Sequence, residues 1–165
     1  MTRTCGNGIS VPSSPAQSTS LPASERWLAR PIFSLGGVDS DFADWGTDVP
    51  GEAKPETQFE VFEQDGNGTF AQIFGAFGVD LDKLCWSQDQ IITFVESHAN
   101  LLHPKGWATF FLFRVGEELF VAHVYRRNAA VGTLRQLEAY VSRLSCGHVW
   151  SAKYRHRFVV PQQTS

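Results

Sequence analysis

Residues 107–126 read WATFFLFRVGEELFVAHVYR, and this stretch constrains the fold more than any other part of the chain. Aromatic and β-branched residues dominate both halves, which is typical of strands, and Gly116-Glu117 lies between them. A glycine at the first position of a two-residue loop supplies the positive φ of a type II′ turn. The sequence therefore predicts a β-hairpin that turns at Gly116-Glu117.

The position of the turn also determines which residues of the two strands face each other. The predicted pairs are Val115 with Glu118, Phe113 with Phe120, Phe111 with Ala122, Thr109 with Val124, and Trp107 with Arg126. These residues form one face that is almost entirely apolar. Because a two-stranded hairpin is marginally stable alone, we expect further strands beside it and a helix over its apolar face.

The segment at about 88–102 has the pattern of the helix that covers this face. Ser87 and Gln90 form a capping box, and a Pro-Lys-Gly sequence at 104–106 ends the segment. Apolar residues between these signals recur at helical spacing along one stripe. The predicted core between helix and hairpin consists of Ile91, Phe94, Val95, Phe111, Phe113, Phe120 and Val124. A shorter helix is predicted between its N-cap, Thr69, and Gly78.

Two further segments extend the predicted sheet. Residues 134–144 fit both a helical stripe and a strand, and we favour an antiparallel strand because the hairpin needs a neighbour. Residues 154–160 predict one more strand, which ends at Pro161. We therefore predict one α+β domain over residues 25–165, with an antiparallel sheet of three to five strands centred on residues 107–126.

Two segments that precede the helices have an unusual composition. Residues 1–24 are rich in Ser, Thr, Pro and Gly and contain few large apolar side chains, which predicts a disordered tail. Residues 39–65 carry nine carboxylates and a single lysine. We interpret residues 39–65 as an acidic excursion, either a solvated loop or a strip over basic residues elsewhere. The sequence also allows a short strand at Phe59–Phe62.

Cysteine usage and hydropathy indicate the compartment. Cys5, Cys85 and Cys146 are an odd number at wide spacing, which is typical of reduced thiols rather than a disulfide framework. The sequence has no run of about 18 apolar residues, and its first residues lack the apolar core of a secretory signal. We therefore expect a cytoplasmic protein without a membrane partner.

Charge is distributed unevenly along the chain. Residues 1–104 hold 5 of the 14 basic side chains and 14 of the 17 acidic ones, a balance of −9, whereas residues 105–165 hold 9 basic and 3 acidic ones, a balance of +6. Basic groups neutralise phosphates, and aromatic rings stack on bases. The C-terminal residues that combine these properties are Tyr125, Arg126, Arg127, Arg135, Tyr140, Arg143, Tyr154, Arg155 and Arg157.

This combination predicts a non-enzymatic binding module whose basic and aromatic surface takes single-stranded RNA or DNA, or a protein partner. The RNP pattern, the zinc finger and the helix-turn-helix are all absent from the sequence. In an alternative interpretation, the arginines pair with the acidic segment of the same chain. In another, the acidic segment mimics nucleic acid and engages a basic protein through Asp41, Asp44 and Asp48.

The main enzymatic alternative is a metal-free ribonuclease. His123 and His156 would then act as base and acid, and a neighbouring arginine would hold the phosphate. A Cys146 nucleophile beside His148 is disfavoured, because residues two positions apart seldom orient as nucleophile and base. The glycine-rich phosphate loop and the G-x-S-x-G elbow of serine hydrolases are both absent from the sequence.

Two sequence patterns suggest metal sites, but both are incomplete. Residues 63–74 have part of the spacing of an EF-hand loop, but Phe74 stands where calcium needs a bidentate glutamate. Tight turns at Asp65-Gly66-Asn67-Gly68 explain the same residues. A zinc site would draw on the remaining candidates, whose spacing matches no common zinc motif: His98, His103, Cys146 and His148. We therefore expect no metal and no cofactor.

Overall fold

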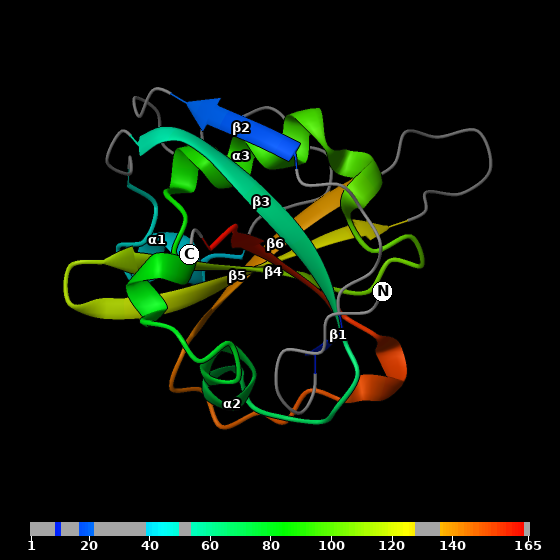
Figure 1. The fold of residues 1–165 in the computed structure, drawn as a ribbon. Helices are drawn as coiled ribbons and strands as arrows, with labels where there is room; N and C mark the ends of the chain where they lie inside the picture. The colour runs from blue at the N-terminus through cyan, green and yellow to red at the C-terminus, as the bar shows by residue number, and fades with distance from the viewer. Residues whose placement is uncertain (1–8, 11–16, 22–38, 50–53, 128–135, 164–165) are drawn as a thin grey trace.

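The computed structural model describes residues 9–10, 17–21, 39–49, 54–127 and 136–163, which form an α+β fold around one sheet (Figure 1). Five strands follow one another across it in the order β3 (Lys54–Gln64), β7 (Arg157–Pro161), β4 (Thr109–Val115), β5 (Glu118–Arg127) and β6 (Gln136–Arg143). Neighbouring strands are antiparallel except β4 and β7, which are parallel. The predicted α+β class is confirmed, with one parallel pair that the sequence did not predict.

The hairpin of β4 and β5 has the predicted register. The four predicted pairs from Thr109 with Val124 to Val115 with Glu118 are all present. Gly116 has the positive φ of +59° that the turn requires. The fifth predicted pair, Trp107 with Arg126, lies beyond the start of β4. There the chain is hydrogen-bonded to β7: the carbonyl of Ala108 accepts a hydrogen bond from the Arg157 amide at 3.1 Å.

Helix α3 (Gln88–Ser97) covers the apolar face of the hairpin. It begins with the predicted capping box of Ser87 and Gln90, and all seven residues of the predicted core lie together in one buried cluster. The helix ends at Ser97 rather than near residue 102. A 3₁₀ turn, η4 (Ala99–Leu101), takes its place because the Leu101 amide bonds three residues back, to the carbonyl of His98.

Helix α2 (Phe70–Gly75) covers the opposite face of the sheet. Thr69 caps it as predicted, in a capping box with Gln72, and the 3₁₀ turn η3 (Leu81–Leu84) follows. Alternate residues of β4 pack on the two sides, so that Phe111 belongs to the cluster under α3 and Phe110 to the cluster under α2. The sheet is therefore buried on both faces, with α3 and α2 on opposite sides (Figure 1).

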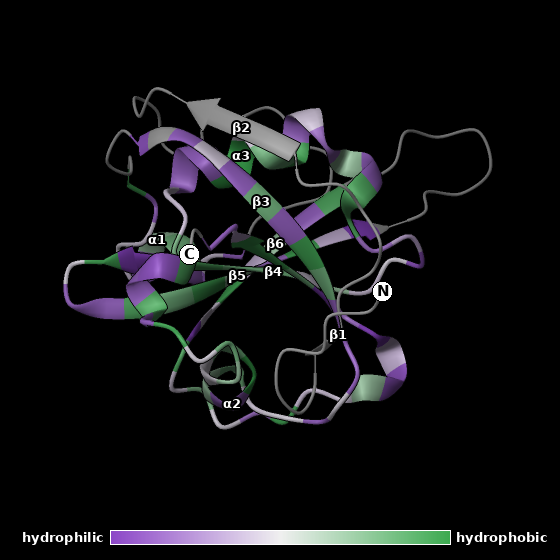
Figure 2. Cartoon of the chain, in the orientation of Figure 1, coloured by the Kyte–Doolittle hydropathy of each residue, from purple (hydrophilic) through white to green (hydrophobic). Residues whose placement is uncertain are grey.

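The interpretation of residues 39–65 as an acidic excursion is corrected by the structure. The segment contains the short helix α1 (Asp41–Asp44) and then β3, which is 11 residues long and pairs with β7 in the body of the sheet. Hydrophilic and hydrophobic positions alternate along β3 (Figure 2). Phe59 and Phe62 are both buried, one in each cluster. The many carboxylates of this segment obscured the two-residue period of a strand, in which they alternate with core residues.

The other predictions on strands have mixed outcomes. Residues 136–143 form a third antiparallel strand beside β5, so the preference for strand over helix is confirmed. Two short strands, β1 (Ile9–Ser10) and β2 (Gln17–Leu21), pair with β3 and fall within the tail predicted as disordered. The rest of residues 1–24 lies outside the described residues, so the predicted domain boundary stays a prediction.

Within the described residues, every helix is too short or too polar to cross a membrane.

Candidate functional site

An aromatic pocket of about 390 Å³ opens where the chain enters β4 and leaves β5. We refer to it as the aromatic pocket, and its lining is Trp107, Tyr125, His148, Val149, Trp150, Ser151, Tyr154 and His156. Side chains with a permanent charge are absent from this lining. The volume is near the lower end of the range of about 300–1,000 Å³ that is typical of small-molecule sites.

Backbone hydrogen bonds to the turn after β3 position the segment that forms one side of the pocket. Gly68 and Trp150 exchange two backbone bonds, of 3.2 and 2.8 Å. The side chain of Asn67 accepts a bond from the Ala152 amide at 2.8 Å, and the buried side chain of Gln64 donates to the Trp150 carbonyl at 2.8 Å. The Asp-Gly-Asn-Gly sequence is therefore a docking turn for residues 150–152.

The pocket has a tilted pair of aromatic rings at its mouth and a partly buried tryptophan behind them. The ring centroids of Trp107 and Tyr154 are 4.2 Å apart with an interplanar angle of 39°, and Trp107 is 37% exposed. The Trp150 ring packs on Phe110 at 4.8 Å and on Phe70 at 5.1 Å, which anchors it in the cluster under α2. One side of the pocket is thus accessible while the other is fixed by the core.

Arg155 supports this arrangement through its backbone. It has a φ of +48° and a ψ of 48°, an uncommon left-handed conformation for a residue other than glycine. It ends the 3₁₀ turn η5 (Ala152–Tyr154) and precedes His156, which is buried. The sharp change of direction at Arg155 places the partly exposed ring of Tyr154 beside the buried ring of His156, with the centroids 5.9 Å apart.

The two histidines of the ribonuclease hypothesis lie around the same aromatic rings but are buried. His123 and His156 are 5% and 4% exposed, and both pack against Phe110 and Trp150 at ring distances of 5.1–5.3 Å. Burial lowers the pKa of His123 to about 3. Burial, with a smaller contribution from the charge of His103, lowers the pKa of His156 to about 4. Both rings are neutral at pH 7, whereas a general acid at that pH needs its proton.

These shifted pKa values predict that the protein loses stability in mild acid. The unfolded chain takes up protons as the pH falls through 6.5, the ordinary histidine pKa, but the folded chain does not protonate His123 or His156 until about 3 and 4. The free energy of unfolding should fall below pH 6.5 by up to about 1.4 kcal/mol per pH unit for each histidine. Urea unfolding at pH 7, 6 and 5 measures this slope.

A pair of variants assigns the slope to the buried rings. His123→Phe keeps a ring among Phe70 and Phe110 and removes one titrating group, so its stability should fall less steeply between pH 7 and 5. Phe77→Leu changes a partly buried ring of the same cluster without removing a histidine, and should leave the slope of the original chain. Identical slopes for His123→Phe and the original chain would contradict the assignment.

The structure disperses the basic residues predicted to form one surface. Arg155 pairs with Glu63 at 3.6 Å on the rim of the pocket. Arg157 pairs with the same carboxylate at 3.4 Å and donates to the Leu101 carbonyl at 2.8 Å, and Arg126 donates to the Ala99 carbonyl at 3.0 Å. Arg126 and Arg157 therefore fasten the η4 segment to the sheet. Arg135 and the side chain of Arg127 lie outside the described residues.

Of two other residues of the predicted surface, Arg143 lies away from the pocket, whereas Tyr140 contacts Tyr125 in its lining. The guanidinium of Arg143 stacks over Trp45 at 4.6 Å, opposite Phe120 in the sheet. Phe120 is five residues from Tyr125, which separates them by about 17 Å along β5. Tyr140 packs edge-on against Tyr125 at 5.4 Å and is 39% exposed, beside a smaller pocket of about 340 Å³.

The sequence analysis selected Tyr125 and Tyr154 but omitted most of the pocket lining. Trp150 was also counted among the aromatic side chains near the basic residues. The lining residues left out of the predicted surface are Trp107, His148, Val149, Ser151 and His156, the last of which was assigned to catalysis. One local signal was available: residues 148–156 alternate aromatic or histidine positions with small and polar ones. The contribution of Trp107 has no local signal, because it depends on pairing between distant segments.

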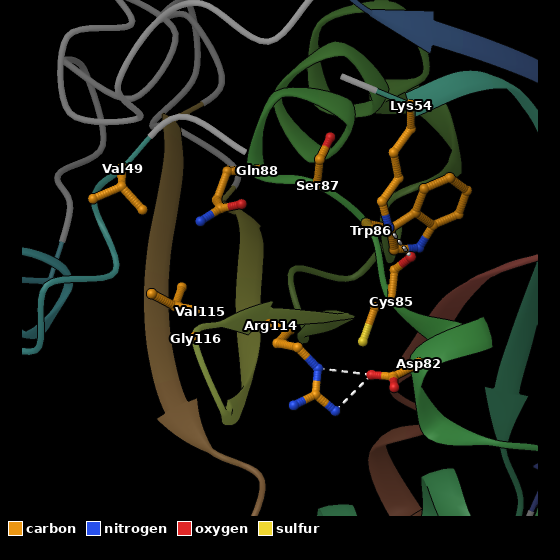
Figure 3. A pocket seen from close by; sticks show the side chains of 10 residues that line it. All are labelled: Val49, Lys54, Asp82, Cys85, Trp86, Ser87, Gln88, Arg114, Val115 and Gly116. Carbon is orange, nitrogen blue, oxygen red and sulfur yellow. Dashed lines mark hydrogen bonds and ion pairs between the residues drawn. The ribbon is translucent and has the colours of Figure 1, made fainter. Parts of the chain in front are cut away.

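A second pocket, of about 440 Å³, has Lys54, Arg114 and Asp82 engaged in polar contacts (Figure 3). Lys54 donates to the Cys85 carbonyl at 3.1 Å, and Nε of Arg114 donates to Asp82 at 2.7 Å. Burial raises the pKa of the Cys85 thiol to about 11, so the sulfur is protonated at neutral pH. The lining of this pocket therefore offers no activated cysteine nucleophile.

Among the described residues, no three His, Cys, Asp or Glu side chains come together as a metal site. Asp48, one of the three carboxylates of the mimic interpretation, is buried. No protein-family model, curated protein or solved structure matches this chain. The functional argument therefore depends on the geometry of this chain alone.

Proposed function

We propose that this protein binds single-stranded nucleic acid and holds one unstacked base in the aromatic pocket. The observation that carries the proposal is the close, tilted pair of Trp107 and Tyr154 at the mouth, beside Trp150. Stacking a base on an aromatic side chain contributes about 1–3 kcal/mol and tolerates every base, because each base has a π-face.

Two exposed cations beside the mouth are suited to the flanking phosphates. The ammonium of Lys153 lies 5.7 Å from the Tyr154 ring, and the side chain of Arg155 is 66% exposed. Neither side chain is needed to hold the core. Their charges supply the salt-dependent attraction to a nucleic-acid backbone, while the uncharged pocket supplies the stacking.

The chemistry of the pocket favours binding over cleavage. An acid–base ribonuclease needs one protonated and one neutral imidazole within reach of the substrate. His123 and His156 are both buried and both have pKa values of about 4 or below. The proposal is therefore a non-enzymatic one.

Fluorescence anisotropy tests the proposal directly. Fluorescein-labelled RNA and DNA decamers of mixed sequence would be titrated with the full chain at 50, 100 and 200 mM salt. We expect saturable binding that weakens steeply as salt increases, because bound phosphates release counterions. Failure to bind at the lowest salt, by protein whose circular dichroism shows it to be folded, would overturn the proposal.

Replacing Glu63 by glutamine tests whether this carboxylate competes with phosphate. Glu63 pairs with Arg155 at 3.6 Å on the rim of the pocket. Releasing Arg155 should strengthen binding by about two- to fivefold, the scale expected for a surface ion pair. Truncation of the acidic segment cannot replace this test, because it would remove β3 from the sheet.

Glu117→Gln is the matched control for this prediction. It removes the same charge from the exposed hairpin turn, far along the strands from the pocket. Both variants should first be compared by thermal melting, because Glu63 also holds Arg157. Equal affinity of the two variants would mean that net charge, and not release of Arg155, sets the effect.

A further inference from the structure

Among the hydrogen-bonding side chains that line the aromatic pocket, some can only donate, several hydroxyls can do both, and none can only accept. His156 shows this most clearly, because its Nδ1 accepts a hydrogen bond from the Ala108 amide at 3.2 Å. The ring is neutral at pH 7, with a pKa of about 4, so its single proton lies on Nε2. The edge of His156 that remains for a ligand is therefore an N–H donor.

Other side chains of the lining also supply hydrogen-bond donors. Ser151 Oγ already accepts a bond from the Lys153 amide at 3.3 Å, which leaves its hydroxyl proton to donate. Trp107 and Trp150 each carry an indole N–H, which can only donate. The indole nitrogen of Trp150 is buried without a hydrogen-bond partner among the described residues. Carboxylate and amide side chains, which would supply strong acceptors, are absent from the lining.

The four bases differ in how well they satisfy such a lining. Uracil and thymine present two carbonyl oxygens and a single N–H on the base edge. Cytosine has the same ring size and also presents two acceptors, O2 and N3, but its amino group carries two donor protons where uracil has one ring N–H, and adenine also carries an amino group. An amino group enclosed without an acceptor loses its hydrogen bonds to water and gains none in return.

We infer that the aromatic pocket selects a uracil or thymine base through the donors of His156 and Ser151. This inference rests on the proposed function, since it names the base that the same site prefers. Stacking on Trp107 and Tyr154 holds any base, and the donors distinguish among the bases that stack. Phosphate contacts by Lys153 and Arg155 do not contribute to the selection, because every base has the same backbone.

Direct titrations with homopolymers test the inference on the full chain. Labelled U10, C10 and A10 RNA and labelled dT10 and dC10 DNA would be compared by anisotropy at one salt concentration. The comparison of U10 with C10 is the sharpest, because the two pyrimidines share ring size and backbone. We expect U10 and dT10 to bind about five- to tenfold more tightly than C10 and dC10.

Two variants show whether the donors cause the preference. Ser151→Ala removes one donor at a partly exposed position and should reduce the U10-to-C10 ratio while C10 affinity changes little. His156→Phe keeps a ring but removes both nitrogens, and should reduce the ratio further if it folds. Lys83→Gln, an exposed lysine outside the pocket, should leave the ratio of the original chain.

The outcomes separate this inference from the proposed function. Tight binding of all homopolymers with equal affinity, or a preference for C10 or A10, would overturn the selection of uracil while single-strand binding stands. A U10 preference that Ser151→Ala and a folded His156→Phe both preserve would overturn the role of the donors. Failure of every homopolymer to bind at 50 mM salt would overturn the proposed function and the inference with it.

Discussion

Alanine in place of Phe110 is expected to lower the free energy of unfolding by about 3–5 kcal/mol. Phe110 is fully buried and lies at the centre of the cluster under α2. Its ring contacts Phe70 and Phe158 at 4.9 Å and Trp150 at 4.8 Å. Removing the ring leaves a cavity between two layers that are too well anchored to collapse, so both burial and contact energy are lost.

Urea unfolding followed by circular dichroism measures this effect, and thermal melting should show a decrease of about 10 °C. Phe77→Ala is the matched control, because Phe77 is only partly buried at the edge of the same cluster and should lose less than half as much. Phe110→Ala should also weaken nucleic-acid binding while still folded, since Trp150 loses its support. A stability loss below about 1 kcal/mol would contradict the central role of Phe110.

Removing the indole of Trp107 is expected to weaken binding of single-stranded nucleic acid by about 10- to 100-fold. The side chain is partly exposed and its ring packs at a tilt against Tyr154, with the centroids 4.2 Å apart, so it presents an aromatic surface outside the core clusters. Loss of one stacked base removes about 1–3 kcal/mol of binding free energy. Anisotropy titration of Trp107→Ala against a mixed decamer measures the change.

Two variants serve as controls for the loss at Trp107. Trp107→Phe retains a ring and should recover most of the affinity, which distinguishes stacking from a general disturbance. Tyr140→Ala removes an aromatic ring of comparable exposure outside the pocket and should change the affinity less than threefold. Affinity of Trp107→Ala within twofold of the original chain would show that the base does not stack at the mouth.

The parts of the fold that sequence analysis predicted are those encoded within a few residues. The turn at Gly116, the N-cap at Thr69 and the capping box at Ser87 each depend on local backbone chemistry, and the structure confirms all three. Only the Phe59–Phe62 part of β3 was anticipated as a strand, because the Glu and Gln residues of β3 lower its mean hydropathy, although Phe59 and Val61 keep the alternation of a strand.

The candidate site was only partly predictable because distant segments build it. The side chain of Gln64 donates a hydrogen bond to the carbonyl of Trp150, 86 residues further along the chain, and no local pattern signals that contact. Too many arginines were assigned to the predicted binding surface, for a different reason. The sequence counts charges, but it cannot indicate that Arg126 and Arg157 already donate to backbone carbonyls.

The position of β7 has a consequence for how the molecule is assembled. Strand β7 lies between β3 and β4, although it follows every other strand in the chain. Before β7 is made, the sheet consists of two separate parts, one around β3 and one around β4, β5 and β6. Joining them requires contacts between residues far apart in sequence, which slows folding. During synthesis, the edges of β3 and β4 therefore stay unpaired until the final strand emerges and closes the sheet at its centre.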